Sequence, residues 1–278
     1  MVKKLSFRET QLAAYEVLKK IAEICDQNGW RYFLAYGSLI GAIRHNGIIP
    51  WDDDIDILMP RPDYDKLRKY FNNNAKQLVP LKLFDPEFTK NYPHMISRVS
   101  DMRYKVVFNN EKDYGIGAFV DIYPLDGVGN NYSNACQLVN KTKVLASLCF
   151  LTSRKGFAKD NTISKTKMLL KIPAYVWANF KGNRHYINKL SEFSKVYKYE
   201  ESKYVACLMW PAGRKNGKNR DVFKKEVFRV MKHKFEDKEF NIPEGYDKFL
   251  KTMYGNYMVP PDKAGKKTNH NYKVYHRK

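Results

Sequence analysis

The pattern of hydrophobic and polar positions predicts an N-terminal helix followed by alternating strands and helices. Apolar residues recur at steps of three and four over residues 6–28. Ser6 and Glu9 have the capping-box spacing at the start of this helix, and Gly29 can end it. An apolar run over 32–36 is typical of a short buried strand, and the alternation of Ile55, Ile57 and Met59 with Asp54, Asp56 and Leu58 fits another. These elements belong together in one α/β unit.

Further along the chain, the same patterns predict more strands and then mainly helices. Residues 62–71 are expected to form a helix with Pro62 in its first turn. Strands are expected at 81–84, 96–99, 105–108 and 119–122, with a turn at Asp126-Gly127. Helices are expected near 133–150, 165–180, 185–199, 221–231 and 246–254. The fold class is therefore α/β (α+β), a mixed β-sheet core flanked by helices, with a mostly helical C-terminal half.

The composition supports a folded globular chain. With 278 residues and 44% apolar residues, the chain can bury a core as one large domain or two modest ones, which excludes intrinsic disorder. No apolar run approaches the ~20 residues that a membrane-spanning helix needs. The N-terminal residues carry positive charge without an apolar stretch behind them, so we expect no signal peptide.

The charge favours anionic partners. Lys and Arg number 50 against 29 Asp and Glu, a net charge of +21, which suits nucleic acid, anionic lipid or phosphorylated molecules. The alternative is a surface kept soluble by its lysines. Between residues 141 and 189, eleven cations stand against the single acid Asp160, among short apolar runs. This segment predicts contact with an anionic membrane surface, although two helices packed on the core would also fit.

Four cysteines, Cys25, Cys136, Cys149 and Cys207, lie mostly among apolar neighbours and form no CxxC pair. They are expected to be buried free thiols, as is usual in a reducing cytoplasm.

The densest chemical signal is Gly37-Ser38 followed by the acidic run that ends in Asp54 and Asp56. Residues i and i+2 of a strand share a face, so these two carboxylates should lie side by side and need a cation between them. Mg²⁺, or Mn²⁺ in its place, is the natural choice for such oxygen ligands next to a phosphate. Gly37 lets a ligand approach the backbone, and Ser38 can bind a phosphate near a helix N-terminus. Asp52 and Asp53 fit a solvated turn equally well.

This arrangement resembles the nucleotidyltransferase superfamily, in which a third carboxylate follows on a neighbouring strand. Asp121, flanked by apolar residues, is the best match here. The run from Tyr36 to Asp56 is similar to the signature block of the LicD family of phosphocholine transferases, and residues 119–126 resemble its second block. Residues 242–247, 253–258 and 260–261 resemble its C-terminal block.

The resemblance implies an enzyme that transfers phosphocholine from CDP-choline to a sugar hydroxyl of a teichoic acid or lipopolysaccharide precursor, with release of CMP. Residues 1–130 would form the nucleotidyltransferase-like catalytic core. Residues 131–278 would form a mostly helical region that contacts acceptor and membrane and closes the active site. A lipid-linked glycan acceptor places the enzyme in the cytoplasm, peripherally on the inner face of the cell membrane. The similar fukutin-like proteins transfer a pentitol phosphate, so the head group stays open.

The roles implied for the site follow the motifs. Asp54, Asp56 and Asp121 would be both the metal ligands and the catalytic residues, with Asp121 sharing the metal or taking the proton of the attacking hydroxyl. Gly37 and Ser38 would bind the donor, and Arg44 and Arg98 would clamp its phosphates. Choline would sit on aromatic faces, and the candidates in order of preference are Trp51, Tyr123 and Trp210.

Two other function classes stay open. A nucleotidyltransferase acting on RNA or a small molecule would release pyrophosphate instead of CMP. A protein that kept the fold for glycan or lipid binding alone would not need all of Asp54, Asp56 and Asp121, and all three are present. The sequence contains no recognisable RNA-binding module, so we expect no nucleic-acid partner.

Overall fold

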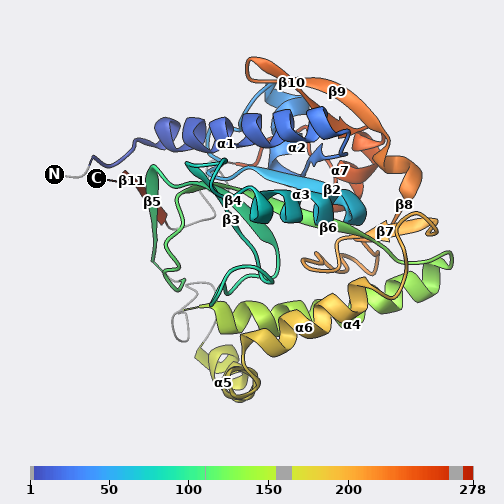
Figure 1. The fold of residues 1–278 in the computed structure, drawn as a ribbon. Helices are drawn as coiled ribbons and strands as arrows, with labels where there is room; N and C mark the ends of the chain where they lie inside the picture. Colours follow the sequence, from blue (N-terminus) through green and yellow to red (C-terminus); the bar gives the residue numbers. More distant parts are fainter. Residues whose placement is uncertain (1–2, 110, 155–164, 263–271, 278) are drawn as a thin grey trace.

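The computed structural model describes residues 3–109, 111–154, 165–262 and 272–277, and the first helix begins as expected. Helix α1 (Phe7–Asn28) is capped by Ser6, whose hydroxyl accepts the Glu9 N–H while the Glu9 carboxylate accepts the Ser6 N–H. Gly29 ends the helix with φ of 66°, a left-handed conformation that suits glycine. The helix lays its apolar face on the central sheet (Figure 1).

The central sheet is mixed, which confirms the predicted α/β class. Its strands run in the order β1-β2-β6-β4-β3, and β7 and β8 extend the sheet from β6. Strands β2 and β6 are parallel, while the other pairs are antiparallel. The bounds are β1 (Phe33–Leu34), β2 (Asp56–Pro60), β3 (Leu81–Phe84), β4 (Ser97–Asp101), β6 (Ala118–Gly127), β7 (Tyr204–Ala206) and β8 (Phe223–Lys224).

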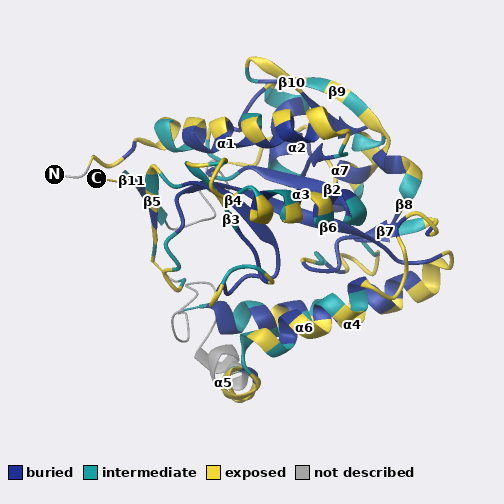
Figure 2. Ribbon diagram, viewed as in Figure 1, coloured by how far each residue is buried: buried dark blue, intermediate teal, exposed yellow. Residues whose placement is uncertain are grey.

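Every residue of β2, β4 and β6 is buried, and Figure 2 shows this part of the sheet in dark blue. Helices α2 (Tyr36–His45) and α3 (Arg61–Asn73) follow β1 and β2 directly. A carboxylate within such a sheet therefore needs a partner or a ligand.

Strand β6 runs further than expected. The turn predicted at Asp126-Gly127 is wrong, because both residues lie inside β6 and pair with β7. The Asp126 carboxylate is fully buried and accepts a hydrogen bond from Arg61 at 2.6 Å, with a second from the N–H of Leu208 at 3.4 Å. A buried ion pair replaces the solvated turn that an Asp-Gly pair usually signals.

Three helices form a separate layer below the sheet, close to the predicted positions (Figure 1). They are α4 (Tyr132–Ser153), α5 (Lys165–Lys181) and α6 (Asn183–Ser194). Helix α4 packs on both α6 and α5, and α5 lies furthest from the sheet. Residues 155–164 and the side chains of 165–171 and 174 lie outside the described residues. The structure therefore bears on the membrane prediction for 141–189 only through the rest of that segment.

The helix predicted near 221–231 is wrong. In its place, β8 leads through a short 3-10 turn (Lys225–Phe228) into a hairpin of β9 (Val230–Phe235) and β10 (Lys238–Pro243). Residues 230–235 alternate between more and less exposed positions, which is the period of a strand. Phe235 and Phe240 are buried and pack against Tyr15 of α1. This tertiary contact favours the hairpin over the local helical propensity.

The two ends of the described chain lie side by side (Figure 1). Strand β11 (Tyr272–His276) pairs with β5 (Tyr104–Phe108), and the N–H of His276 donates to the carbonyl of Lys3. Helix α7 (Tyr246–Tyr254) packs against α2 and the 3-10 turn. Strands and a helix from beyond residue 130 thus join elements from before it, while the proposed domain boundary itself stays a prediction.

Two further predictions concern burial and the membrane. Cys25, Cys136, Cys149 and Cys207 are all buried free thiols, as expected. Among the described residues, every helix is too short or too polar to cross a bilayer.

Candidate active site

Three carboxylates converge at one edge of the parallel strand pair. Asp56 opens β2, and its register partner on β6 is Asp121. Asp54 lies two residues before Asp56, on the same side of the chain. One ligand oxygen of each of the three lies within 4.8 Å of the others. The structure therefore brings together the three aspartates that the sequence motifs singled out.

Asp56 is the least compensated carboxylate of this cluster. Burial raises the pKa of Asp56 well above its usual value, and the charges of Asp54, Asp121 and Asp52 raise it further. Its Oδ1 has no hydrogen-bond partner among the described residues. A buried oxygen without a partner, surrounded by like charges, is costly unless a cation shares it.

The donor set fits a hard divalent cation. Asp54, Asp56 and Asp121 offer oxygen ligands only, which is what Mg²⁺ prefers. A second group of neighbouring carboxylates, Asp52, Asp53 and Asp54, shares Asp54 with the first. Asp52 and Asp53, which fit a solvated turn by sequence, are therefore close to the site.

Arg98 forms a buried ion pair with Asp121. On β4, Arg98 is the antiparallel register partner of Asp121, so Asp56, Asp121 and Arg98 form a row across three strands. The guanidinium Nε donates to Asp121 Oδ1 at 2.5 Å, and Nη2 to Oδ2 at 3.3 Å. Nη1 donates to the hydroxyl of Tyr114, and the guanidinium lies over the ring of Phe119. These contacts orient the Asp121 carboxylate, while clamping of a phosphate by Arg98 stays a prediction.

Gly37 and Ser38 position two of the aspartates. Both lie in the first turn of α2, where the sequence pattern had placed the end of a strand. The Ser38 hydroxyl accepts the backbone N–H of Asp56 at 2.9 Å. A Cβ on Gly37 would lie 2.3 Å from Oδ2 of Asp52, so only glycine leaves room for that carboxylate. The Gly-Ser pair thus supports the acidic cluster directly, in addition to the phosphate contact predicted for it.

Arg44 and Trp51 lie near the other end of α2. Arg44 donates from Nη1 to the carbonyl of Tyr257 at 2.5 Å, and burial lowers the pKa of its guanidinium. The Trp51 indole packs edge-on against His45, with ring centroids 5.7 Å apart. The substrate contacts predicted for Arg44 and Trp51 stay predictions.

Tyrosines surround the acidic cluster. Tyr123 of β6 packs edge-on against Tyr36, with ring centroids 5.2 Å apart. Burial raises the pKa of Tyr123 well above its usual value, and the charges of Asp56 and Asp121 add to this. Its phenol therefore stays protonated and can donate a hydrogen bond.

Three of these tyrosines were not assigned a role from the sequence. Tyr36 has φ of 47°, a strained conformation for a bulky residue that is often found at functional sites. Tyr272 of β11 donates its hydroxyl to the carbonyl of Asp53. Burial raises the pKa of Tyr254 of α7, and the charges of Asp56, Asp52 and Asp54 raise it further. In the sequence, Tyr36 opens the family-like signature block and Tyr254 lies in the C-terminal block, whereas no motif signals Tyr272.

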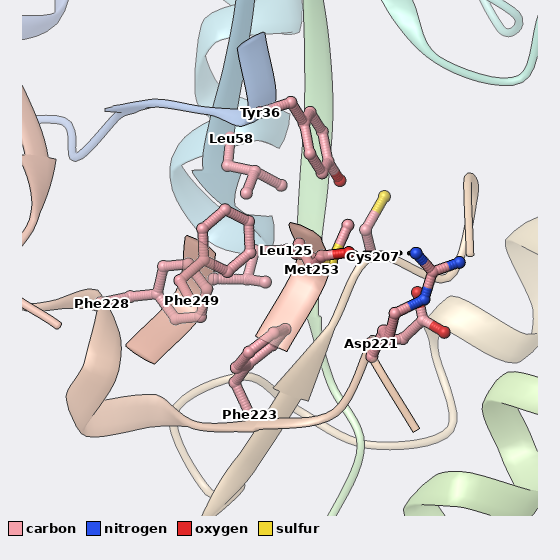
Figure 3. A pocket seen from close by; sticks show the side chains of 10 residues that line it. Tyr36, Leu58, Leu125, Cys207, Asp221, Phe223, Phe228, Phe249 and Met253 are labelled. Carbon is pink, nitrogen blue, oxygen red and sulfur yellow. Dashed lines mark hydrogen bonds between the residues drawn. The ribbon is translucent and has the colours of Figure 1, made fainter. Parts of the chain in front are cut away.

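A small aromatic cavity adjoins Tyr36 (Figure 3). The rings of Phe223, Phe228 and Phe249 lie on one side of it, and Asp221 lies on the other. Its volume of about 10 Å³ admits no more than a water molecule, so a choline head group does not fit there in this conformation.

Comparison with known proteins gives matches over parts of the chain and, for one relative, over nearly its whole length. Residues 29–151 match the family model described as LicD/FKTN/FKRP, nucleotidyltransferase domain. The Lipopolysaccharide cholinephosphotransferase LicD of Haemophilus influenzae is 28% identical over 277 residues, 99% of each chain. An uncharacterised protein of Rickettsia typhi is 32% identical over 115 residues, 41% of this chain and 35% of that protein. The Ribitol 5-phosphate transferases of Mus musculus and Homo sapiens are 44% identical over 45 residues, 16% of this chain and 9% of theirs.

Proposed function

Since the chain belongs to the LicD family, we propose that it transfers phosphocholine from CDP-choline to a hydroxyl of a glycan, with release of CMP. The protein is a transferase, in line with its full-length relative, which is named a lipopolysaccharide cholinephosphotransferase. The observation that carries the proposal is the convergence of Asp54, Asp56 and Asp121, with one oxygen of Asp56 lacking a partner among the described residues. A teichoic acid or lipopolysaccharide precursor is the glycan we propose.

Asp54, Asp56 and Asp121 would hold a magnesium ion beside the diphosphate of the donor. When bound, the ion neutralises charge on the transferring phosphoryl group and on the leaving phosphate. The acceptor oxygen forms a bond to the phosphorus that carries choline, and the bond from that phosphorus to the CMP oxygen breaks. The hydroxyl proton passes to a carboxylate of the cluster. These residues would lower the barrier mainly by positioning the reactants and by presenting preorganised charges in a site with little water.

The contacts of Asp121 favour a ligand role over that of the base. Both of its oxygens accept hydrogen bonds from Arg98, which stabilises the charged carboxylate and fixes its orientation. Asp54 is half-buried and therefore nearer to solvent than Asp56 or Asp121. This makes Asp54 the better placed of the three to pass a proton on.

The face of α5 supports a peripheral contact with the membrane. Ile172, Val176 and Phe180 follow one another at steps of four and are 39%, 60% and 84% exposed, and Trp177 beside them is 53% exposed. Residues four apart lie on one side of a helix. Exposed aromatic and aliphatic side chains on a basic protein suit the interface of an anionic bilayer. We propose that this face brings the enzyme to lipid-linked acceptors on the cytoplasmic side.

The test is ³¹P NMR of the protein with CDP-choline and Mg²⁺, with and without a lipid-linked glycan extract. We expect CMP and a new phosphodiester to appear with the extract, and neither to appear with Asp56→Asn. CDP-ribitol and CDP-glycerol in parallel samples identify the head group. Turnover of CTP to pyrophosphate with CDP-choline untouched would contradict the proposal and favour a nucleotidyltransferase.

A further inference from the structure

A basic groove lies beside the acidic cluster, on the C-terminal part of the chain. It has a volume of about 1040 Å³ and is lined by α7, the start of β8 and the loop over 214–220. Its lining includes seven cations and, among the described residues, no carboxylate. Six are exposed, namely Arg214, Lys215, Lys218, Lys224, Lys248 and Lys251, and the seventh is the half-buried Arg220.

The loop over 214–220, which carries four of these cations, is held in a defined shape. Lys215 and Lys218 exchange two backbone hydrogen bonds of 3.0 Å, around a turn with φ of 50° at Asn216 and 76° at Gly217. Positive φ at both central residues marks a type I′ hairpin turn, for which Asn-Gly is the preferred pair. The hairpin therefore projects its cations from a rigid support.

Buried polar contacts anchor both ends of this hairpin. The Asp221 carboxylate accepts the N–H groups of Ala212 and Gly213 at 2.6 and 2.7 Å. Arg220 donates to the carbonyls of Ala212, Gly213 and Met253, which ties the loop to the end of α7. The lining of the groove thus has a fixed geometry, as a binding site requires.

The charge of the groove is largely uncompensated. Lys224 and Lys251 each pair with an exposed carboxylate, Glu226 and Asp247, at 3.5 and 2.7 Å. Within the part of the chain that the structure describes, Arg214, Lys215, Lys218 and Lys248 form no ion pair with a carboxylate. Like charges gathered in one concavity repel one another and create a field that attracts anions.

The groove adjoins the small aromatic cavity beside Tyr36. Tyr254 lines the groove, and the charges of Asp56, Asp52 and Asp54 act on the Tyr254 phenol. Arg220, Phe223 and Met253 line both the groove and the small aromatic cavity beside Tyr36. A chain bound along the groove would therefore pass Tyr254 and the mouth of this cavity.

We propose that this groove binds phosphate groups of the acceptor glycan, so that the enzyme selects an acceptor that carries phosphates near the hydroxyl it modifies. The identity of the ligand as acceptor rests on the proposed function. Exposed lysines and an arginine on a fixed support are suited to phosphates along a flexible chain. The concave shape and the rigid hairpin favour such a chain over a flat bilayer, and the exposed apolar residues suited to lipid lie on α5 instead.

A binding measurement tests the groove without turnover. The probe is a fluorescent oligo(glycerol phosphate), followed by anisotropy at low and high salt. Replacing Arg214, Lys215 and Lys218 by Gln should weaken binding by about tenfold, because each exposed ion pair contributes modestly. The control replaces the exposed Lys69, Lys76 and Lys90 by Gln, which removes the same charge outside the groove. Equal weakening in both variants would overturn the proposal.

Measurements of turnover distinguish a failure of the groove assignment from a failure of the proposed function. The hairpin variant should raise the KM for a phosphate-bearing acceptor by about tenfold with kcat kept, and should match the wild type on an acceptor stripped of its phosphates. Transfer at wild-type KM in the hairpin variant would refute the groove assignment while leaving the transferase intact. Loss of all transfer from CDP-alcohols, with probe binding retained in the groove, would refute the proposed function instead. Phosphatidylglycerol vesicles or an oligothymidylate could instead bind through the same cations more tightly than the oligo(glycerol phosphate) probe. That result would overturn the glycan assignment in favour of lipid or nucleic acid.

Discussion

At the scale of single residues, the site is defined by an electrostatic conflict at Asp56. Its carboxylate is buried among Asp54, Asp121 and Asp52, and one oxygen has no hydrogen-bond partner among the described residues. Arg98 compensates the neighbouring Asp121 through two hydrogen bonds. The fold therefore keeps a destabilising group of like charges at this position, which is typical of functional sites.

Asp56→Asn should raise the Tm of the chelator-treated protein while abolishing turnover, because it removes a buried charge from a group of like charges. The rise should be roughly 2–4 °C for each kcal/mol of repulsion removed. Added Mg²⁺ should raise the Tm of the wild type and leave that of the variant unchanged. Differential scanning fluorimetry, with and without EDTA, measures both effects.

The difference in Tm between Asp56→Asn and the wild type should change with pH in a defined direction. The folded pKa of Asp56 is raised, so the folded state binds more protons than the unfolded state above about pH 4, the ordinary carboxyl value. Stability of the metal-free wild type then falls as pH rises, until the folded carboxyl has ionised. The Tm advantage of Asp56→Asn should grow over this range, and an advantage that is constant or shrinks with pH would contradict the assignment.

At the scale of elements, two features create the site: the parallel register of β2 and β6, and the first turn of α2. The register sets Asp56 opposite Asp121, and the antiparallel β4 adds Arg98 to the same row. The first turn of α2 supplies the Ser38 hydroxyl to the Asp56 N–H and leaves space for Asp52 at Gly37. A side chain at Gly37 would therefore disturb the acidic cluster more than the stability of the fold.

Gly37→Ala should lower kcat by about 10–100-fold, because the new methyl group displaces the Asp52 carboxylate by about an ångström. The Tm should change little, since the atom in the way is the end of a flexible side chain and alanine favours a helix by about 1 kcal/mol. Steady-state kinetics and a thermal melt measure the two effects.

Gly41→Ala in the same helix is the contrasting variant. Its Cβ would lie 2.5 Å from the backbone carbonyl of Gly47, which cannot move cheaply, so this variant should lose stability. A Gly37→Ala protein that melts as early as Gly41→Ala, or that keeps full kcat, would show that Gly37 does not act through Asp52.

At the scale of the whole molecule, different surfaces carry the functions we propose for acceptor and membrane. The basic groove is lined by α7 and the loop over 214–220, whereas Ile172, Val176, Trp177 and Phe180 are exposed on α5, which lies far from the sheet in Figure 1. Each surface can therefore be changed without touching the carboxylates.

Replacing Trp177 and Phe180 by Ser should reduce binding to phosphatidylglycerol vesicles by at least about tenfold, because two exposed aromatic side chains lose their contact with lipid. Vesicle sedimentation at low and high salt measures this effect. Leu12→Ser with Val230→Ser, which also removes two exposed apolar side chains, serves as the control and should bind as the wild type. Equal binding by all three proteins would contradict a membrane contact through α5.

The sequence by itself determined the features that depend on local spacing. The capping box at Ser6 and Glu9, the strand 81–84 and the helix 246–254 follow from periodicity and end signals, and the structure confirms them. The i,i+2 spacing paired Asp54 with Asp56, and the family resemblance added Asp121 to the predicted acidic cluster.

Only the tertiary structure decided what depends on neighbours distant in sequence. The β9–β10 hairpin stands where a helix was expected, because Phe235 and Phe240 pack on α1. Asp126 is buried in a strand because Arg61 compensates its charge. The basic hairpin lies beside the end of α7 only because Arg220 donates to the carbonyl of Met253, and α7 in turn packs against α2. Burial and charge compensation act between residues far apart in the chain, and a local pattern carries no record of them.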